Sequence, residues 1–206
     1  PRIANKIIKK HISLLGGEVV DEEYFNLGEK NFKKVVNNIV KKKPDVVLNT
    51  INGDSNLYFF QELKKRSIGS DTIPVVSFSI GENELKMFAN ESIVGHYAVW
   101  SYFQNIKSKE NFTFKQAYRS TYGHNDNISD PMEAGYISLH MWAAAVKKAN
   151  SFEIEKVKKY LYETKFTAPQ GVVWIDSKNN HLVKFSRLAR IRKNQEFTIL
   201  WSTGMP

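Results

Sequence analysis

The segment 44–56 constrains the fold more than any other part of this sequence. Residues 45–50 form a short apolar run, Asp-Val-Val-Leu-Asn-Thr, which predicts a strand buried on both faces. The run changes at once into the polar loop Asn-Gly-Asp-Ser-Asn, and a helical pattern with Leu57, Phe60 and Leu63 on one side follows. Open α/β sheets place ligands where a buried parallel strand ends in such a loop. We therefore expect a small-molecule site at this loop.

Residues 1–93 alternate between helical and extended patterns. The predicted helices lie at about 3–15, 31–43, 54–66 and 82–89, and the extended segments lie at 18–25, 45–50 and 73–78. Gly16 and Gly17 end the first helix, because glycine favours helix C-termini. Repeated strand–helix winding predicts an α/β fold with a parallel sheet flanked by helices and right-handed crossovers.

The pattern changes near Val94. Residues 94–103 form a long extended run that is rich in aromatic side chains, and helical patterns then dominate. The later predicted helices lie at about 111–122, 131–149 and 153–163, and the predicted strands at 171–175, 182–192 and 196–202. The last two strands are expected to form a hairpin around Lys193 and Asn194.

The predicted helix at 131–149 carries a start signal. Asp130 is the expected N-cap, Pro131 the first helical residue, and Glu133 the third, which can reach back as in a capping box. The helix is apolar on most sides, so we expect it to be buried against partners on several faces. His140, on the same helix, is expected to be a core residue with its hydrogen bonds satisfied.

Several classes of protein are excluded by composition. The sequence has no cysteine, which rules out disulfides and zinc sites built on thiolates, and no histidine pair has metal-ligand spacing. We therefore expect no metal, no cofactor and no catalytic residue. The net charge of +9 comes from lysines scattered over the polar sides of predicted helices, so no nucleic-acid partner is expected. No apolar run approaches the roughly 20 residues that cross a bilayer.

The polar loop can be assessed by its chemistry. It offers side-chain amides, a carboxylate and a hydroxyl, but neither the repeated glycines nor the lysine of a phosphate site. Asp54 can accept from two N–H groups at once, Ser55 can donate or accept, and Gly53 permits close backbone approach. This set suits a small neutral polar molecule. Asp54 and Ser55 also fit ordinary N-capping of the following helix, and that alternative stays open here.

Five segments in order resemble the urea and short-chain amide substrate-binding proteins of ABC transporters, from Arg2 to Ser202. They are residues 49–56 (Asn-Thr-Ile-Asn-Gly-Asp-Ser-Asn), 74–79 (Pro-Val-Val-Ser-Phe-Ser), 94–104 (Val-Gly-His-Tyr-Ala-Val-Trp-Ser-Tyr-Phe-Gln), 130–137 (Asp-Pro-Met-Glu-Ala-Gly-Tyr-Ile) and 168–171 (Ala-Pro-Gln-Gly). The segment Ala-Arg-Ile-Arg at 189–192 fits as well.

The resemblance implies a type I periplasmic-binding fold, with two α/β lobes and a ligand held between them. Residues 1–93 would form the second lobe, 94–170 a crossing strand and helices of the first lobe, and 171–206 a return to the second lobe. The N-terminal portion of the first lobe would then be missing. Pro1 leads straight into an amphipathic helix without a signal peptide, so the chain is expected to be a fragment.

The function implied is capture of urea or a short-chain amide in an interlobe cleft and delivery to an ABC transporter outside the cytoplasm. The expected partners are a small amide, a membrane permease, and either the missing first-lobe segment or another chain covering helix 131–149. A lipid anchor is compatible with this function. The expected ligand-binding residues are Asn52, Gly53, Asp54, Ser55, Ser77, Phe78, Ser79 and Trp100. Phe78 fits the core equally well, and Trp100 fits hinge packing.

Two related functions remain open at this point. The same module could be the amide-sensing region of a receptor, or it could bind branched-chain amino acids. Enzymatic activity fits less well, since the sequence has no Gly-x-Ser-x-Gly nucleophile elbow. The adjacent pair Glu22 and Glu23 would point to opposite faces of a strand, which makes a catalytic dyad unworkable.

Overall fold

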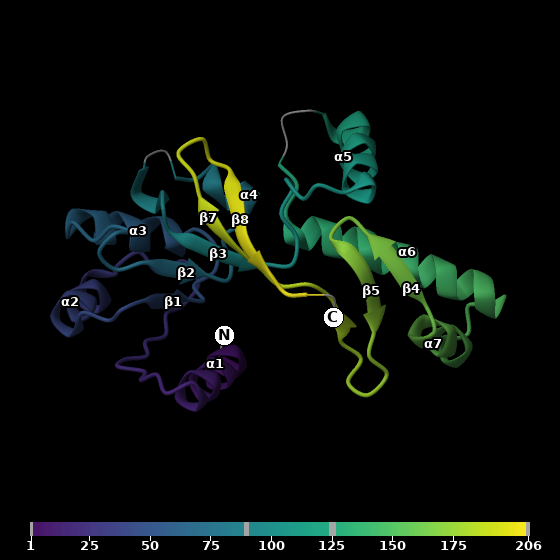
Figure 1. Ribbon diagram of the computed structural model, residues 1–206, viewed down its shortest axis with the longest axis horizontal. Helices are drawn as coiled ribbons and strands as arrows, with labels where there is room; N and C mark the ends of the chain where they lie inside the picture. Colours follow the sequence, from purple (N-terminus) through teal and green to yellow (C-terminus); the bar gives the residue numbers. More distant parts are fainter. Residues whose placement is uncertain (1, 89–90, 124–126, 205–206) are drawn as a thin grey trace. The chain divides into compact units, whose positions relative to one another are not determined.

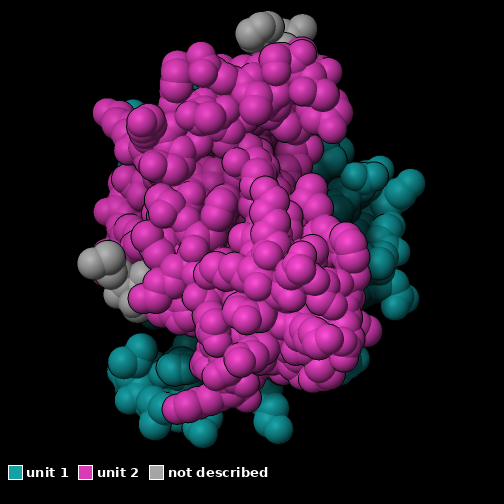
Figure 2. Space-filling view, turned by 90° about the vertical axis from the view of Figure 1, so that its right-hand side faces the viewer, with its two compact units in different colours: residues 1–80, 84–98, 190–196 teal, residues 81–83, 99–189, 197–206 magenta. Residues whose placement is uncertain are grey.

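The computed structural model describes residues 2–88, 91–123 and 127–204, and the chain forms two compact units. Unit 1 comprises residues 1–80, 84–98 and 190–196, and unit 2 comprises residues 81–83, 99–189 and 197–206 (Figure 2). Residues 171–189, which we expected in the second lobe, belong to unit 2 together with 99–170. The assignment of segments to lobes stays a prediction.

Unit 1 is built on short parallel strands with helices between them (Figure 1). Its elements are α1 (Arg2–Leu14), α2 (Lys33–Lys42), β1 (Val47–Asn49), α3 (Ser55–Lys65), β2 (Val75–Ser77) and the first part of β3 (Tyr97–Trp100). The register pairs Asn49 of β1 with Ser77 of β2, and Ser77 with Ala98 of β3. The predicted parallel α/β winding is confirmed.

Element bounds in unit 1 follow the sequence patterns closely, with two differences. The expected extended segment at 18–25 forms no strand. The expected helix at 82–89 is replaced by the single turn α4 (Glu82–Leu85) and the 3₁₀ turn η1 (Glu91–Ile93), while residue 89 lies outside the described residues. Gly16 ends α1 as predicted and adopts φ +79°, a left-handed conformation that glycine reaches without strain.

The core of unit 1 is a run of aromatic rings. Phe32, Phe59, Phe60 and Phe88 are all buried, and successive ring centroids lie 5.5–5.6 Å apart in edge-to-face geometry. His96 extends this run, with its ring 5.3 Å from that of Phe60. Burial lowers the pKa of His96 to about 4, so its neutral ring accepts a hydrogen bond from the Val75 backbone N–H to Nδ1 at 3.0 Å. This bond ties β2 to the segment that leads into β3.

Unit 2 combines helices with a separate antiparallel sheet of order β4-β5-β6 (Figure 1). Its elements are α5 (Lys109–Tyr122), α6 (Asp130–Ala149), α7 (Ile154–Tyr162), β4 (Lys165–Ala168), β5 (Gly171–Ile175) and β6 (Leu182–Val183). Ile137 and Met141 of α6 pack with Ala168 of β4 and Val173 of β5 to form its core. The sequence patterns did not predict β4.

The predicted hairpin around Lys193 and Asn194 is confirmed, but its first strand is shorter than the predicted 182–192. The strands β7 (Arg187–Ile191) and β8 (Phe197–Ser202) are neighbours in the five-stranded sheet of order β1-β2-β3-β7-β8. A hydrogen bond from Arg192 N to Glu196 O at 2.8 Å closes the turn between them. Leu182 and Val183, which were expected in the same strand as 187–191, pair with β5 instead.

Helix α6 differs from its prediction in three respects. It begins at Asp130 with Ser129 as N-cap and without a side-chain capping bond, so the predicted capping box is wrong. The helix was expected to be buried on several faces, but Leu139 is 63% exposed and Trp142 is 46% exposed. His140 is exposed and lies flat on the Phe166 ring at 5.5 Å, so its predicted place in the core is also wrong.

Crossing a bilayer as a helix requires both length and an apolar surface. Within residues 2–88, 91–123 and 127–204, none of the helices meets both requirements.

Candidate functional site

The polar loop lies where the sequence predicted it, at the carboxyl ends of β1 and β2 in unit 1. These strands are parallel neighbours, so Asn49 at the end of β1 lies beside Ser77 at the end of β2. The Phe78 backbone N–H continues the ladder by donating to the Asn49 carbonyl at 3.0 Å. Residues that follow the two strands therefore share one edge of the sheet.

A buried amide at Asn49 organises this edge. Its Nδ2 donates to Asn56 Oδ1 at 2.8 Å and to Ser77 Oγ at 3.1 Å. Its Oδ1 accepts from the Ile51 backbone N–H at 2.9 Å. All three side chains are at most 3% exposed. Asn49 thus joins β1, β2 and the first turn of α3, a role that was not predicted from the sequence.

A second amide, Asn56, fixes the loop backbone. Its Nδ2 donates to the Ile51 carbonyl at 2.8 Å and to the Gly53 carbonyl at 3.2 Å. The Ser79 hydroxyl, which follows β2, also donates to the Ile51 carbonyl. Gly53 adopts φ +66°, where a side chain would be strained. The loop is therefore held in one shape by bonds from both strands and from α3.

The N-capping interpretation of Asp54 and Ser55 is not supported by their geometry. Asp54 occupies the N-cap position of α3, but its backbone is helical (φ −62°, ψ −20°) and its side chain makes no capping bond. Asp54 is exposed to solvent. Ser55 is 1% exposed, and its hydroxyl is buried without a hydrogen-bond partner. N-capping therefore does not account for these two residues.

The other predicted site residues fall into three environments. Asn52 and Gly53 are exposed on the loop, while Phe78 and Ser79 are half-buried beside it. Ser77 is fully buried and its hydroxyl is bonded to Asn49, which indicates a positioning role. Trp100 is half-buried at the end of β3 and belongs to unit 2, so it is described apart from this edge. Ligand contact by these residues stays a prediction.

The edge offers hydrogen-bonding groups rather than a metal site. Asp54 supplies two acceptor oxygens, and the Asn52 amide can donate or accept. The N-terminal turn of α3 presents the positive end of its dipole to the same loop. In the part of the chain that the structure describes, no group of three or more histidine, aspartate or glutamate side chains could hold a metal ion.

Unit 2 contains a second buried polar cluster that the sequence analysis did not predict. Glu133 is fully buried, and its carboxylate accepts from the Gln170 backbone N–H at 3.2 Å and from Gln170 Nε2 at 2.8 Å. Asp130 accepts from the Ser101 and Tyr102 backbone N–H groups at 3.0 and 2.8 Å. Burial raises the pKa of Glu133 to about 7. The cluster ties α6 to the segments before α5 and after β4.

Arg187 completes this cluster. Its guanidinium donates to the Gln170 carbonyl at 2.6 Å and to the Ser101 carbonyl, and it is 8% exposed. Burial lowers the pKa of Arg187, while the nearby Glu133 and Asp130 act in the opposite sense. Because these groups bond mainly to backbone within unit 2, we assign the cluster a structural role.

Comparison with known proteins now adds to this geometry. Residues 1–206 match a family described as periplasmic binding protein domain. A substrate-binding protein of an amino acid ABC transporter from Pseudomonas fluorescens Pf-5 has a similar structure, with a TM-score of 0.84 and 19% identity. That match covers 96% of this chain and 55% of the other. The expected type I periplasmic-binding fold is confirmed.

Two further solved structures with a similar fold are of proteins whose ligands are known. A solute-binding protein of an ABC transporter from Rhodopseudomonas palustris HaA2, in complex with p-hydroxybenzoic acid, matches with a TM-score of 0.88 and 18% identity over 98% of this chain and 56% of that one. A leucine-, isoleucine-, valine-, threonine- and alanine-binding protein from Brucella ovis, in a closed conformation, matches with a TM-score of 0.84 and 13% identity. That match covers 97% of this chain and 53% of the other.

One curated relative has a different name. Over 112 residues the chain is 34% identical to a limonene hydroxylase from Geobacillus stearothermophilus, which covers 54% of this chain and 20% of that protein. The chain therefore spans a fifth of this relative and slightly more than half the length of each solved structure described above.

Proposed function

The chain belongs to the periplasmic binding protein family, and from this premise we propose that it forms part of a solute-binding protein that captures urea or a short-chain amide for an ABC transporter. The family implies a periplasmic or extracellular location. Its proteins bind solutes without transforming them, which confirms the expectation that the chain is not an enzyme. A membrane permease is the transport partner we propose, and a lipid anchor would fit this role.

One observation supports the proposal: Asp54 is exposed in the loop that follows β1, and its side chain does not cap α3. Urea and simple amides offer paired N–H donors, and a carboxylate can accept two of them at once. The bonds from Asn49, Asn56 and Ser79 hold the loop in place before ligand arrives. A preorganised acceptor loses less freedom on binding, which favours capture of a small ligand.

The size of the ligand limits its affinity. The best very small ligands gain about 1.5 kcal/mol per non-hydrogen atom, so urea could gain roughly 6 kcal/mol. That corresponds to a dissociation constant of some tens of micromolar. Approaching this value requires groups on nearly every side of the ligand. The chain spans slightly more than half the length of each solved structure described above, so we expect it to bind more weakly than a protein of their full length.

Asp54→Ala is expected to weaken urea or acetamide binding by about tenfold or more, since the carboxylate acceptor is lost. Stability should change little because the Asp54 side chain makes no capping bond. Asp45→Ala is a matched control, as it removes another exposed carboxylate from the opposite end of the same strand. Isothermal titration calorimetry measures the affinity of each variant for urea or acetamide, and thermal unfolding measures its stability.

The same titrations test the ligand class. A preference for leucine or p-hydroxybenzoate over urea, acetamide and formamide would reject the amide assignment. Equal loss of affinity in Asp54→Ala and Asp45→Ala would show that the carboxylate acts only through overall charge. If amides bind but no permease is associated with the protein, the receptor alternative gains support instead.

A further inference from the structure

The turn between α6 and α7 carries the most exposed large apolar side chains of unit 2. Phe152 is 79% exposed and Ile154 is 77% exposed, more than any other large apolar side chain that the structure describes in this unit. The ring of Trp142 lies 6.2 Å from that of Phe152 and extends the apolar surface back along α6. Figure 1 shows the turn at the outer end of α6, away from β5 and β6.

Local contacts give the turn a defined shape. Asn150 ends α6 in a left-handed conformation with φ +46°, which asparagine tolerates better than most residues. The Ser151 hydroxyl then accepts from the Glu153 backbone N–H at 3.0 Å. Val157, one turn into α7, is buried and packs that helix onto unit 2. The side chain of Phe152 is therefore held outside the core of the unit.

Exposed lysines accompany this apolar turn. Residues 147–165 contain six lysines and three glutamates, so their net charge is positive. One of the glutamates, Glu153, is paired with Lys156 at 2.8 Å. All six lysines are exposed, and they are Lys147, Lys148, Lys156, Lys158, Lys159 and Lys165. The turn thus combines an apolar tip with positive charge on both of the helices that it connects.

This combination fits a membrane better than a second protein. A stable protein interface buries about 800 Å² on each partner, and two side chains on one turn supply only a small part of that area. A bilayer can take in protruding side chains from all sides, and its anionic headgroups attract lysine. The charge of the turn is therefore complementary to a surface of anionic phospholipid.

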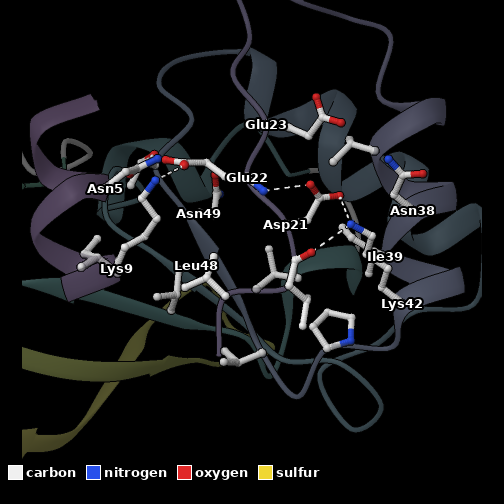
Figure 3. A pocket seen from close by; sticks show the side chains of 18 of the residues that line it. Asn5, Lys9, Asp21, Glu22, Glu23, Asn38, Ile39, Lys42, Leu48 and Asn49 are labelled. Atoms are coloured by element: carbon white, nitrogen blue, oxygen red, sulfur yellow. Dashed lines mark hydrogen bonds and ion pairs between the residues drawn. The ribbon is translucent and has the colours of Figure 1, made fainter. Parts of the chain in front are cut away.

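A groove in unit 1 presents its apolar side chains in a different form. Ile8 and Ile12 of α1 line this groove of about 690 Å³, which α1, α2, β1 and residues 17–23 border (Figure 3). Lys42 and Asp21, 3.0 Å apart, form an ion pair among its lining residues. A flat bilayer surface cannot enter such a hollow, so the groove does not compete with the α6–α7 turn as a membrane contact.

We propose that the α6–α7 turn is a membrane-contact site that inserts Phe152 and Ile154 into the headgroup region of an anionic phospholipid bilayer. The neighbouring lysines pair with the lipid phosphates. Since no helix within residues 2–88, 91–123 and 127–204 can span a bilayer, this contact is peripheral. The periplasmic or extracellular location that the family implies brings a membrane within reach. The inference does not depend on which solute the polar loop binds.

Vesicle sedimentation tests the site on the 206-residue chain. One set of vesicles contains equal parts of phosphatidylglycerol and phosphatidylcholine, and the neutral control contains phosphatidylcholine alone. We expect saturable binding to the anionic vesicles and at least about tenfold weaker binding to the neutral ones, because the attraction for lysine is lost. Raising NaCl from about 0.1 to 1 M should also weaken binding. Equal binding to both vesicles, or binding to neither, would overturn the proposal.

Removing the apolar tip separates insertion from attraction by overall charge. The double variant Phe152→Ser, Ile154→Ser keeps the net charge of +9 and should bind anionic vesicles at least about tenfold more weakly. The double variant Phe112→Ser, Leu200→Ser is the matched control, since it removes two exposed apolar side chains from α5 and β8 of the same unit. It should bind like the unaltered chain, with circular dichroism confirming that both variants fold. Equal binding by the two double variants would contradict the proposal.

The lysines can be tested in the same way. Lys147→Gln, Lys148→Gln removes two exposed charges beside the turn and should weaken binding to anionic vesicles by about fivefold or more. Lys33→Gln, Lys34→Gln removes two adjacent exposed charges from α2, so its net charge is the same. We expect little change in this control. Equal weakening in both variants would mean that overall charge, rather than the turn, attracts the membrane.

A dye at position 152 reports on insertion directly. The sequence has no cysteine, so Phe152→Cys can be labelled at a single site with an environment-sensitive dye, and Phe112→Cys is the labelled control. Anionic vesicles should shift the dye emission to shorter wavelength at position 152 and leave it unchanged at position 112. Sedimentation velocity without vesicles tests the other occupant. A stable dimer that Phe152→Ser, Ile154→Ser abolishes would assign the turn to a second copy of the chain and reject the membrane.

Discussion

Replacing Asn49 with alanine is expected to lower the free energy of unfolding by about 3 kcal/mol or more, because one side chain makes three buried hydrogen bonds. Asn56 Oδ1 and Ser77 Oγ would lose the donor Nδ2, and the Ile51 N–H would lose the acceptor Oδ1. Asn49 is 3% exposed, so water cannot readily replace these partners. Guanidinium unfolding followed by circular dichroism measures the loss, and urea is avoided because it is the proposed ligand.

Asn52→Ala is the matched control for this prediction. It makes the same chemical change in the same loop, but Asn52 is exposed, so we expect a change within about 0.5 kcal/mol. Ser77→Ala should fall between the two, since it removes one of the three bonds. An Asn49→Ala protein as stable as Asn52→Ala would show that the amide network does not hold the two strands together.

Periodicity predicted much of the fold because helix and strand patterns are local. The expected helix at 54–66 is observed as Ser55–Lys65, and the expected strand at 45–50 as Val47–Asn49. The strand is shorter than its apolar run because pairing with β2 ends where the polar loop begins. Strand β4 was missed because Lys-Phe-Thr-Ala, although it alternates between polar and apolar residues, is too short to stand out as a strand, and its pairing with β5 creates it.

Local signals failed where distant partners took over the same groups. Asp130 and Glu133 have the spacing of a capping box, but their carboxylates accept hydrogen bonds from Tyr102 and Gln170. These partners lie 28 and 37 residues away in the sequence, so no local pattern could reveal them. Helix α6 was expected to be buried because of its composition, yet exposure depends on which elements pack against it.

The position of the candidate site was predicted from the sequence, but the hydrogen bonds that support its loop were not. The change from an apolar run to Asn-Gly-Asp-Ser-Asn was enough to locate the loop. The bond from Asn49 to Ser77 depends on the register of β1 against β2, which sequence alone does not give. An asparagine as the last residue of a buried strand is a signal that could have pointed to Asn49, because a buried amide requires partners.

The buried carboxyl of Glu133 predicts a pH dependence that is independent of the ligand site. Burial raises its pKa from the ordinary 4.5 to about 7, so the folded state holds a proton that the unfolded state has released. The contribution of Glu133 to stability is therefore greatest below pH 4.5 and is lost as the pH rises through 7. A shift of this size corresponds to roughly 3 kcal/mol.

Glu133→Gln isolates this effect, because glutamine cannot ionise but keeps an acceptor for Gln170. We expect the stability of the variant relative to the unaltered chain to rise by roughly 3 kcal/mol between pH 4.5 and 8. All four tryptophans belong to unit 2, so their fluorescence reports on unfolding around Glu133. A difference that does not change with pH would mean that Glu133 stays ionised in the folded state, stabilised by Gln170 and Lys184 against the cost of burial.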